Sequence, residues 1–285
     1  MNVDKFLGCT LGLLAGDQIG STVERMTACE IQSRCGEISD FLPESHRTDD
    51  SQTYLATMQA YIDANGRFDM DAIAERHVEV SKNEWAGWGR STRKSCQRLE
   101  SGVHWSKSGE PGGSGNGVIP RITVLGLRQS LLREDIVQFC EDGILFAKMT
   151  HLGTPAIVSA IVHAVSIASL AGRSDSKLHI YSHLQFLKQV AEATEEMLLA
   201  GGEERISKQI SRIMSLIRFE NLEDEDGVQE GGDSLEKKSI LCRASIEEIN
   251  SWFGGGGSYA YHSFGFSYAL FARCALKRQL GEHVH

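Results

Sequence analysis

Apolar residues recur at three- and four-residue intervals along most of this 285-residue chain, and this spacing is the strongest restriction on its fold. Residues 49–64, for example, place Leu55, Met58 and Ile62 at helical intervals. No convincing run alternates apolar and polar residues in the way that half-buried strands do. The sequence therefore predicts an all-α protein. No segment divides the chain clearly, so we expect a single domain over residues 1–285.

The same periodicity sets the expected boundaries of the helices. The first helix begins near Phe6 and is expected to end at the turn Gly16-Asp17-Gln18-Ile19-Gly20, because glycine favours helix C-termini. Helices are further expected over residues 49–64, 70–80, 89–101, 119–132, 136–150, 154–171, 181–199, 203–218, 246–252 and 259–280.

Charge and composition exclude several classes of function. The formal net charge is -9, and an acidic surface repels phosphate backbones, which argues against a nucleic-acid-binding protein. The longest apolar stretch, residues 156–171, is interrupted by His163, so no membrane span is expected. The N-terminus lacks the features of a signal peptide, and seven cysteines without a C-x-x-C pair suggest reduced thiols. These features favour a cytoplasmic protein.

An acidic tetrad, Thr48-Asp49-Asp50-Ser51, precedes the second expected helix. Two adjacent carboxylates and a hydroxyl can converge on a hard cation such as Mg²⁺, which prefers oxygen ligands. The same residues also suit an ordinary helix N-terminus, where Thr or Asp caps the helix and acidic residues fill the first turn. Local sequence alone favours the capping interpretation by about two to one.

Two glycine-rich segments allow a close approach of backbone to a ligand. Residues 112–117 lead directly into a helix, so their N–H groups could hold a phosphate, although a flexible linker is an equal alternative. Residues 254–257 are four glycines followed by Ser258 and Tyr259, where Tyr259 could stack on a base or anchor the next helix.

Three further residues have a structural as well as a functional interpretation. Asp17 lies between turn glycines and Glu24 follows shortly after; in isolation they suit a helix C-terminus and a solvated carboxylate. His151, after Thr150, stands at the end of a helix, where a lone histidine most often interacts with the helix dipole.

Taken together and in order, six segments resemble the ADP-ribosylglycohydrolase family, the group that includes the dinitrogenase reductase-activating glycohydrolases. Each segment alone is weak, but six in register are specific, and the resemblance covers about residues 3–275. The segments are Gly8-x3-Gly12-x2-Ala15-Gly16-Asp17-x2-Gly20-x3-Glu24, Thr48-Asp49-Asp50-Ser51-Gln52, Gly87-Trp88-Gly89-x2-Thr92, Gly115-Asn116-Gly117-x3-Arg121-x3-Leu125-Gly126, Thr150-His151-x3-Pro155-x7-His163-Ala164 and Gly257-Ser258-Tyr259.

The resemblance implies an orthogonal bundle of helices around a cleft with two Mg²⁺ ions, and an enzyme that removes ADP-ribose from a modified side chain or a related conjugate. ADP-ribose or an ADP-ribosylated protein would be its partner. The implied metal ligands are Thr48, Asp49 and Asp50, and the implied catalytic residues are Glu24, on a mobile loop, with Asp49 and Asp50. The implied substrate contacts are Asp17, Gly115, Asn116, Gly117, Thr150, His151, Ser258 and Tyr259.

The chain departs from the family pattern in one respect. The second metal motif of the family, an Asp-x-Asp-Thr/Ser run, is expected after the helix that begins at Tyr259, and no such run follows. Gly231-Gly232-Asp233-Ser234 is similar, but it precedes that helix. Three interpretations therefore stay open: a hydrolase, a catalytically impaired protein that binds ADP-ribose or a partner, and a helical scaffold without a ligand.

Overall fold

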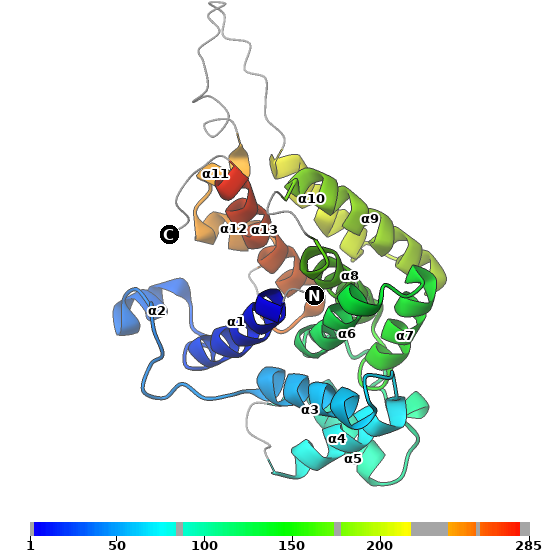
Figure 1. Ribbon diagram of the computed structural model, residues 1–285. Coiled ribbons are helices and arrows are strands. Elements are labelled where there is room, and N and C mark those ends of the chain that lie inside the picture. Colours follow the sequence, from blue (N-terminus) through cyan, green and yellow to red (C-terminus); the bar gives the residue numbers. More distant parts are fainter. Residues whose placement is uncertain (1–2, 84–87, 174–177, 218–238, 255–256, 280–285) are drawn as a thin grey trace, which may run out of the picture. The chain divides into compact units, whose positions relative to one another are not determined.

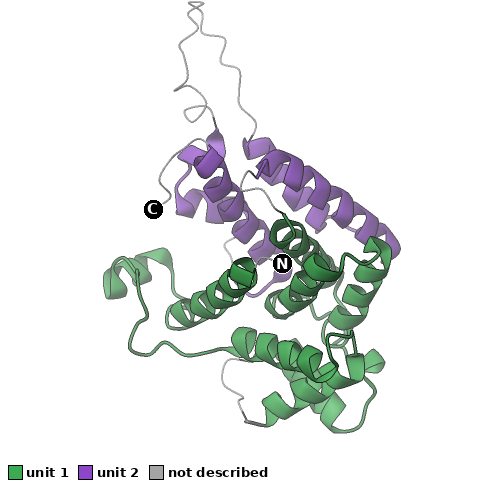
Figure 2. Cartoon of the chain, in the orientation of Figure 1, with its two compact units in different colours: residues 1–173 green, residues 174–285 purple. Residues whose placement is uncertain are grey.

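The computed structural model describes residues 3–83, 88–173, 178–217, 239–254 and 257–279. Within these ranges the regular elements are helices and no strand is formed, although Glu110 and His151 pair in an isolated bridge (Figure 1). This confirms the all-α prediction. The chain divides into two compact units, residues 1–173 and 174–285, which are considered separately (Figure 2). The single-domain organisation stays a prediction.

The boundaries of most helices agree with those expected from periodicity. The first unit contains α1 (Val3–Ser21), α2 (Ala28–Cys35), α3 (Asp49–Asp63), α4 (Met70–Asn83), α5 (Arg90–Glu100), the 3-10 turn η1 (Trp105–Lys107), α6 (Ile119–Leu132), α7 (Ile136–Lys148) and α8 (Thr154–Ala171). The second contains α9 (Ile180–Met197), α10 (Ile206–Ile217), α11 (Ile240–Arg243), α12 (Ile246–Trp252) and α13 (Ala260–Gln279).

The core of the first unit is built on the α6–α8 pair (Figure 1). Gly126 of α6 lies so close to α8 that a Cβ atom there would come within 2.5 Å of the Ala164 carbonyl oxygen. Helix α3 packs against α4 and α6, and α7 packs against α8. Because α6 is in contact with both α3 and α8, it connects the acidic start of α3 with the residues that precede α8.

Helix α8 needs separate comment because its length and apolar composition would suffice to cross a membrane. More than half of it is buried inside the protein, with Val158, Ile161 and Val165 almost inaccessible to solvent. A helix that is apolar on nearly all sides is typical of the centre of a helical core as well as of a membrane span. The absence of a membrane span stays a prediction.

Two local predictions were wrong at the N-terminus. Helix α1 does not end at Gly16–Gly20 but continues to Ser21, because contacts with other elements outweigh the low helix propensity of its glycines. The Thr10 hydroxyl is hydrogen-bonded to Tyr54 at 2.7 Å, and Asp17 binds the start of α3. Helix α2 was missed, although Thr27 and Glu30 form a capping box at its start.

The second unit is organised around α9, α10 and α13. Gly265 of α13 lies against α10, where an added Cβ would approach the Gln209 side chain to 3.0 Å. Gln209 also donates a hydrogen bond to the Tyr261 carbonyl at 3.2 Å, and Phe264 stacks on Tyr268. These contacts fix the helix that follows Ser258 and Tyr259.

Three histidines in the first unit make its stability depend on pH. Burial lowers the pKa of His77 and of His151 to about 3 and that of His163 to about 4. Below the unfolded-state pKa of about 6.5, the unfolded chain takes up protons that the folded chain does not. We expect the free energy of unfolding, constant for these groups above that pH, to fall by about 2 kcal/mol per histidine by pH 5. Urea unfolding at pH 7.5 and 5.0 measures this.

Two variants test whether His77 causes part of the pH dependence of the free energy of unfolding. His77→Leu loses the hydrogen bond from Nδ1 to the Ile73 carbonyl and should remove about a third of the fall in stability that the three histidines cause. His179→Gln, at an exposed histidine, should leave it unchanged. Equal pH dependence in the wild type and His77→Leu would contradict the assignment.

Candidate functional site

The Asp17 carboxylate joins the end of α1 to the start of α3. Its Oδ2 atom accepts the backbone N–H of Thr48 at 3.0 Å and that of Ser51 at 3.3 Å, and its Oδ1 atom accepts the Thr48 hydroxyl. The Thr48 hydroxyl in turn accepts the N–H of Asp50. Asp17 and Thr48 together therefore cap α3, and the predicted substrate residue Asp17 binds protein N–H groups.

Asp49 and Asp50, in the first turn of α3, occupy an environment that opposes ionisation. Burial raises the pKa of Asp49. Burial, followed by the negative charges of Asp49 and Asp17, raises the pKa of Asp50 to about 8. Carboxylates crowded in this way favour a cation nearby. The structure thus places Asp17, a predicted substrate contact, beside Asp49 and Asp50, which were predicted to be catalytic and metal-binding.

The oxygen atoms around Asp50 suit Mg²⁺. Mg²⁺ is commonly bound through one or two carboxylates and retains several waters, so it needs no complete protein cage. Within the described ranges, no three His, Cys, Asp or Glu side chains form a ready-made cage. The Ser51 hydroxyl, next to Asp50, is buried without a hydrogen-bond partner, and such an oxygen is available to a ligand. Thr48, Asp49 and Asp50 are thus chemically suited to hold the ion.

The glycine-rich loop, residues 112–117, ends beside the Asp49 carboxylate. The Asp49 Oδ2 atom accepts the N–H of Gly89 at 3.0 Å. A Cβ atom on Gly117 would lie 3.8 Å from that oxygen and 3.5 Å from the Thr92 hydroxyl. Residues 115–117, predicted to bind phosphate or ribose, therefore end beside the acidic start of α3. The N-terminus of α6 follows at Ile119, whose N–H donates to the Asn116 carbonyl at 2.8 Å.

Thr150 and His151 support the other side of this loop. Thr150 is completely buried, and its carbonyl accepts the Ser95 hydroxyl at 3.2 Å and the Glu110 N–H at 3.1 Å. Its hydroxyl lies 2.8 Å from Nδ1 of His151. Burial, followed by the positive charge of Arg121, lowers the pKa of His151 to about 3, so the imidazole is neutral at pH 7.

Arg121 contacts this group of residues, and sequence reasoning gave it no role, although it stands in one of the segments that carry the family resemblance. Its guanidinium donates to the Gly117 carbonyl at 3.0 Å and to the Thr150 hydroxyl. It therefore links the glycine loop to the Thr150-His151 pair. An arginine in the mainly apolar first half of α6 could have been noticed in the sequence, since arginine is rarely buried without a partner.

Of the remaining predicted residues, Glu24 lies near Asp50, whereas Ser258 and Tyr259 belong to the other unit. Glu24 is exposed in the turn after α1, near enough for its charge to raise the pKa of Asp50. Ser258 and Tyr259 belong to the second unit, where the Tyr259 hydroxyl donates to Glu204. Their association with the residues of the first unit stays a prediction. Residues 231–234, the segment similar to the second metal motif, lie outside the described residues.

These features define an all-α protein with an acidic helix start, a glycine loop and a buried Thr-His pair, and comparison with known sequences identifies its class. The sequence matches the ADP-ribosylglycohydrolase family over residues 2–279. The chain belongs to this family, as the sequence motifs predicted.

Several relatives are similar to parts of the chain. An uncharacterised protein of Archaeoglobus fulgidus is 30% identical over 58% of this chain and 55% of its own length. ADP-ribosylhydrolase ARH3 of Bos taurus is 26% identical over 82% of this chain and 69% of its own length. ADP-ribosylarginine hydrolase Tri1 of Serratia proteamaculans is 32% identical over 46% of this chain and 39% of its own length. The chain thus spans about half the length of the archaeal relative.

The crowding of carboxylates predicts a stability effect at Asp50. In the absence of divalent ions, Asp50→Asn should raise the melting temperature by a few degrees at pH 8, because it removes a buried repulsive charge. Adding Mg²⁺ should stabilise the wild type and have little effect on the variant. Differential scanning fluorimetry checks both. Glu75→Gln, at an exposed acidic residue of α4, serves as the control; equal stabilisation of the wild type and Asp50→Asn by Mg²⁺ would contradict this prediction.

The position of Gly153 predicts a separate effect on the glycine loop. An added Cβ would lie 2.0 Å from the Ser114 hydroxyl oxygen and 2.7 Å from the Gly113 carbonyl oxygen. Gly153→Ala should displace the loop and weaken binding of ADP-ribose about tenfold, as misplacement of a binding loop does. Calorimetric titration measures the affinity. Gly201→Ala, where an added Cβ meets nothing within 4 Å, is the matched control, and undiminished binding to Gly153→Ala would show that the loop does not contact the ligand.

Proposed function

We propose that this protein is a hydrolase that releases ADP-ribose from a modified protein side chain or a related ADP-ribosyl conjugate, and that it uses Mg²⁺. One observation carries the proposal: the carboxylate of Asp49 lies beside Gly89 and Gly117, so acidic groups and a glycine loop meet at one place. A sugar linked to a diphosphate presents hydroxyls and anionic oxygens to these two kinds of group. The family membership and the ARH3 and Tri1 relatives support this substrate class.

The chemistry required is hydrolysis at the anomeric carbon of the ribose. Water adds to that carbon as the bond to the leaving nitrogen or oxygen breaks, through a transition state with oxocarbenium character. Asp50 is the residue suited to accept the proton from water, and Thr48 and Asp49 would help to hold the ion. Mg²⁺, when bound, supplies a positive charge that orients ribose hydroxyls and polarises water. Backbone N–H groups of residues 115–117 would bind the diphosphate.

A second candidate, an ADP-ribose-binding protein without turnover, is favoured by the hydrogen bonds of the acidic residues. Both oxygens of Asp17 and one of Asp49 are already engaged by protein donors, which leaves fewer oxygens for metal. The two candidates differ in thermal stability. Stabilisation by ADP-ribose that requires Mg²⁺ supports the hydrolase, whereas stabilisation without Mg²⁺ supports the binding protein. A scaffold without a ligand would not respond.

The proposed hydrolase function predicts that replacing both acidic residues of α3 removes the activity. Asp49→Ala combined with Asp50→Ala should abolish release of ADP-ribose from an ADP-ribosylated protein while leaving the fold intact, because Asp17 and Thr48 supply the side-chain cap of α3. Release is measured by chromatography of the product, and folding by circular dichroism. Glu75→Ala should retain full activity. Unchanged turnover in the double variant would remove both carboxylates from the mechanism.

A further inference from the structure

Arg121 occupies a position that is unfavourable for a positive charge. It is 0% exposed, in the first turn of α6, where the helix dipole repels cations. In the described part of the chain, no carboxylate lies within ion-pair distance of its guanidinium, and its Nε atom has no hydrogen-bond partner. Burying a charge in this way is costly. The guanidinium must therefore be held by interactions that depend on its particular shape and charge.

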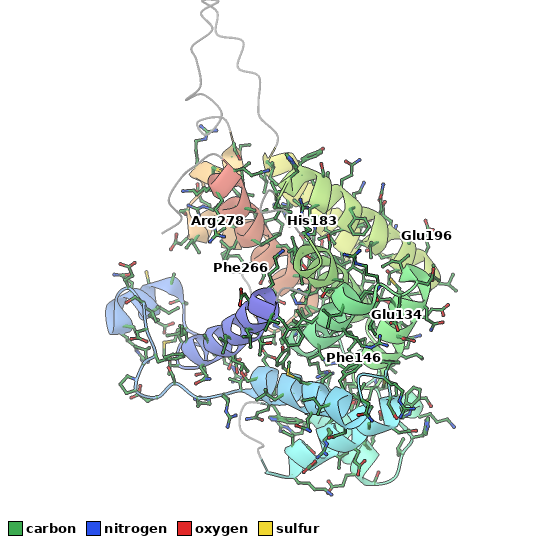
Figure 3. The ribbon with its side chains drawn as sticks, in the orientation of Figure 1. Glu134, Phe146, His183, Glu196, Phe266 and Arg278 are labelled. Carbon is green, nitrogen blue, oxygen red and sulfur yellow. The ribbon has the colours of Figure 1, made fainter. Side chains whose placement is uncertain are left out.

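Those interactions connect three separate segments. Nη1 donates to the Gly117 carbonyl at 3.0 Å and contacts the Thr92 hydroxyl of α5 at 3.4 Å, while Nη2 donates to the Thr150 hydroxyl. The guanidinium lies 5.8 Å from the ring centre of Phe146, a fully buried residue of α7 that is labelled in Figure 3. A planar fork with donors at two ends suits this geometry, and an ammonium group does not.

The hydroxyl of Thr150 extends the connection to His151. A guanidinium can only donate, so the hydroxyl oxygen accepts from Arg121 and must send its own hydrogen elsewhere. Thr150 is completely buried, and the acceptor that its hydroxyl reaches in the described structure is Nδ1 of His151, at 2.8 Å. Because buried hydroxyl hydrogens are almost always bonded, Nδ1 must be unprotonated and the hydrogen of the neutral imidazole lies on Nε2.

We propose that Arg121 is a positioning residue: it fixes the Gly117 end of the glycine loop and, through the Thr150 hydroxyl, holds His151 as the neutral Nε2–H tautomer. The tautomer of His151 does not depend on the proposed function; only its consequence for ligand binding rests on that function. A neutral histidine with a fixed Nε2–H is a hydrogen-bond donor for an anionic oxygen, the class of group that a diphosphate presents. Asp49 and Asp50 supply the compensating negative charge, since their charges favour the protonated guanidinium.

The tautomer can be measured in the ligand-free protein. Nitrogen NMR of the ¹⁵N-histidine-labelled protein at pH 7, with His151 assigned by its loss in His151→Gln, should show an unprotonated Nδ1 and a protonated Nε2. Thr150→Val keeps the side-chain shape and removes the hydroxyl, so His151 should become a mixture of tautomers. Arg121→Lys keeps the positive charge and removes the planar guanidinium. We expect a mixture of His151 tautomers in this variant as well. A wild-type His151 protonated on Nδ1, or a tautomer unchanged in both variants, would overturn the proposal.

A matched control and a second measurement separate this inference from the proposed function. Arg128→Lys makes the same change on α6 at a residue bound to Gly66 and Glu134, and should leave the His151 signals unchanged. Calorimetry should show ADP-ribose binding to Arg121→Lys about tenfold more weakly than to the wild type, as expected for the loss of a charged hydrogen bond. Failure of wild-type binding would reject the proposed function and leave the tautomer result standing. Unchanged affinity in Arg121→Lys would reject a role for Arg121 in ligand binding.

Discussion

The arrangement of the first unit depends on one carboxylate, that of Asp17. It accepts two backbone N–H groups and one hydroxyl at the start of α3, and these donors have no partners within their own helix. The same bonds keep α1 helical through a glycine-rich sequence. Because the N-terminus of α3 is held against α1, the two carboxylates that follow Thr48 are brought to a defined position, where the helix dipole partly compensates their charge.

The buried guanidinium of Arg121 also affects the carboxylates at the start of α3. Burial and the mutual repulsion of Asp49, Asp50 and Asp17 raise the pKa of Asp49 and Asp50, and the positive charge of buried Arg121 partly opposes this rise. Arg121 sits on α6, which is the helix in contact with both α3 and α8. The core packing and the electrostatics of the site are therefore coupled, since the helix that fills the centre of the unit also carries the compensating cation.

Periodicity in the sequence was sufficient to predict most helices from α3 to α13, because each buries one apolar face and that face repeats every 3.6 residues. It was insufficient at α1, where Gly16 and Gly20 favour an end but a contact between distant residues, Asp17 with Thr48, continues the helix. The acidic tetrad and the glycine loop were identified as separate motifs. Their meeting at Asp49 and the role of Arg121 depend on packing between α3, α5 and α6, which no local pattern contains.

The sequence left open whether the acidic tetrad caps a helix or binds a metal, and the structure divides these roles between residues. Thr48 and Asp17 form the cap; both Asp17 oxygens accept protein donors, whereas the Thr48 hydroxyl accepts one N–H and keeps a second lone pair. In the described part of the chain, no N–H or O–H group donates to the Asp50 carboxylate, although it is the most strongly perturbed acid of the group. A cap that relies on Asp17 from a different helix thus leaves Asp50 available to a ligand. Capping and ligand binding are compatible at the same helix terminus because the Asp17 carboxylate satisfies the N–H groups of Thr48 and Ser51 and the Asp50 carboxylate is not needed for the cap.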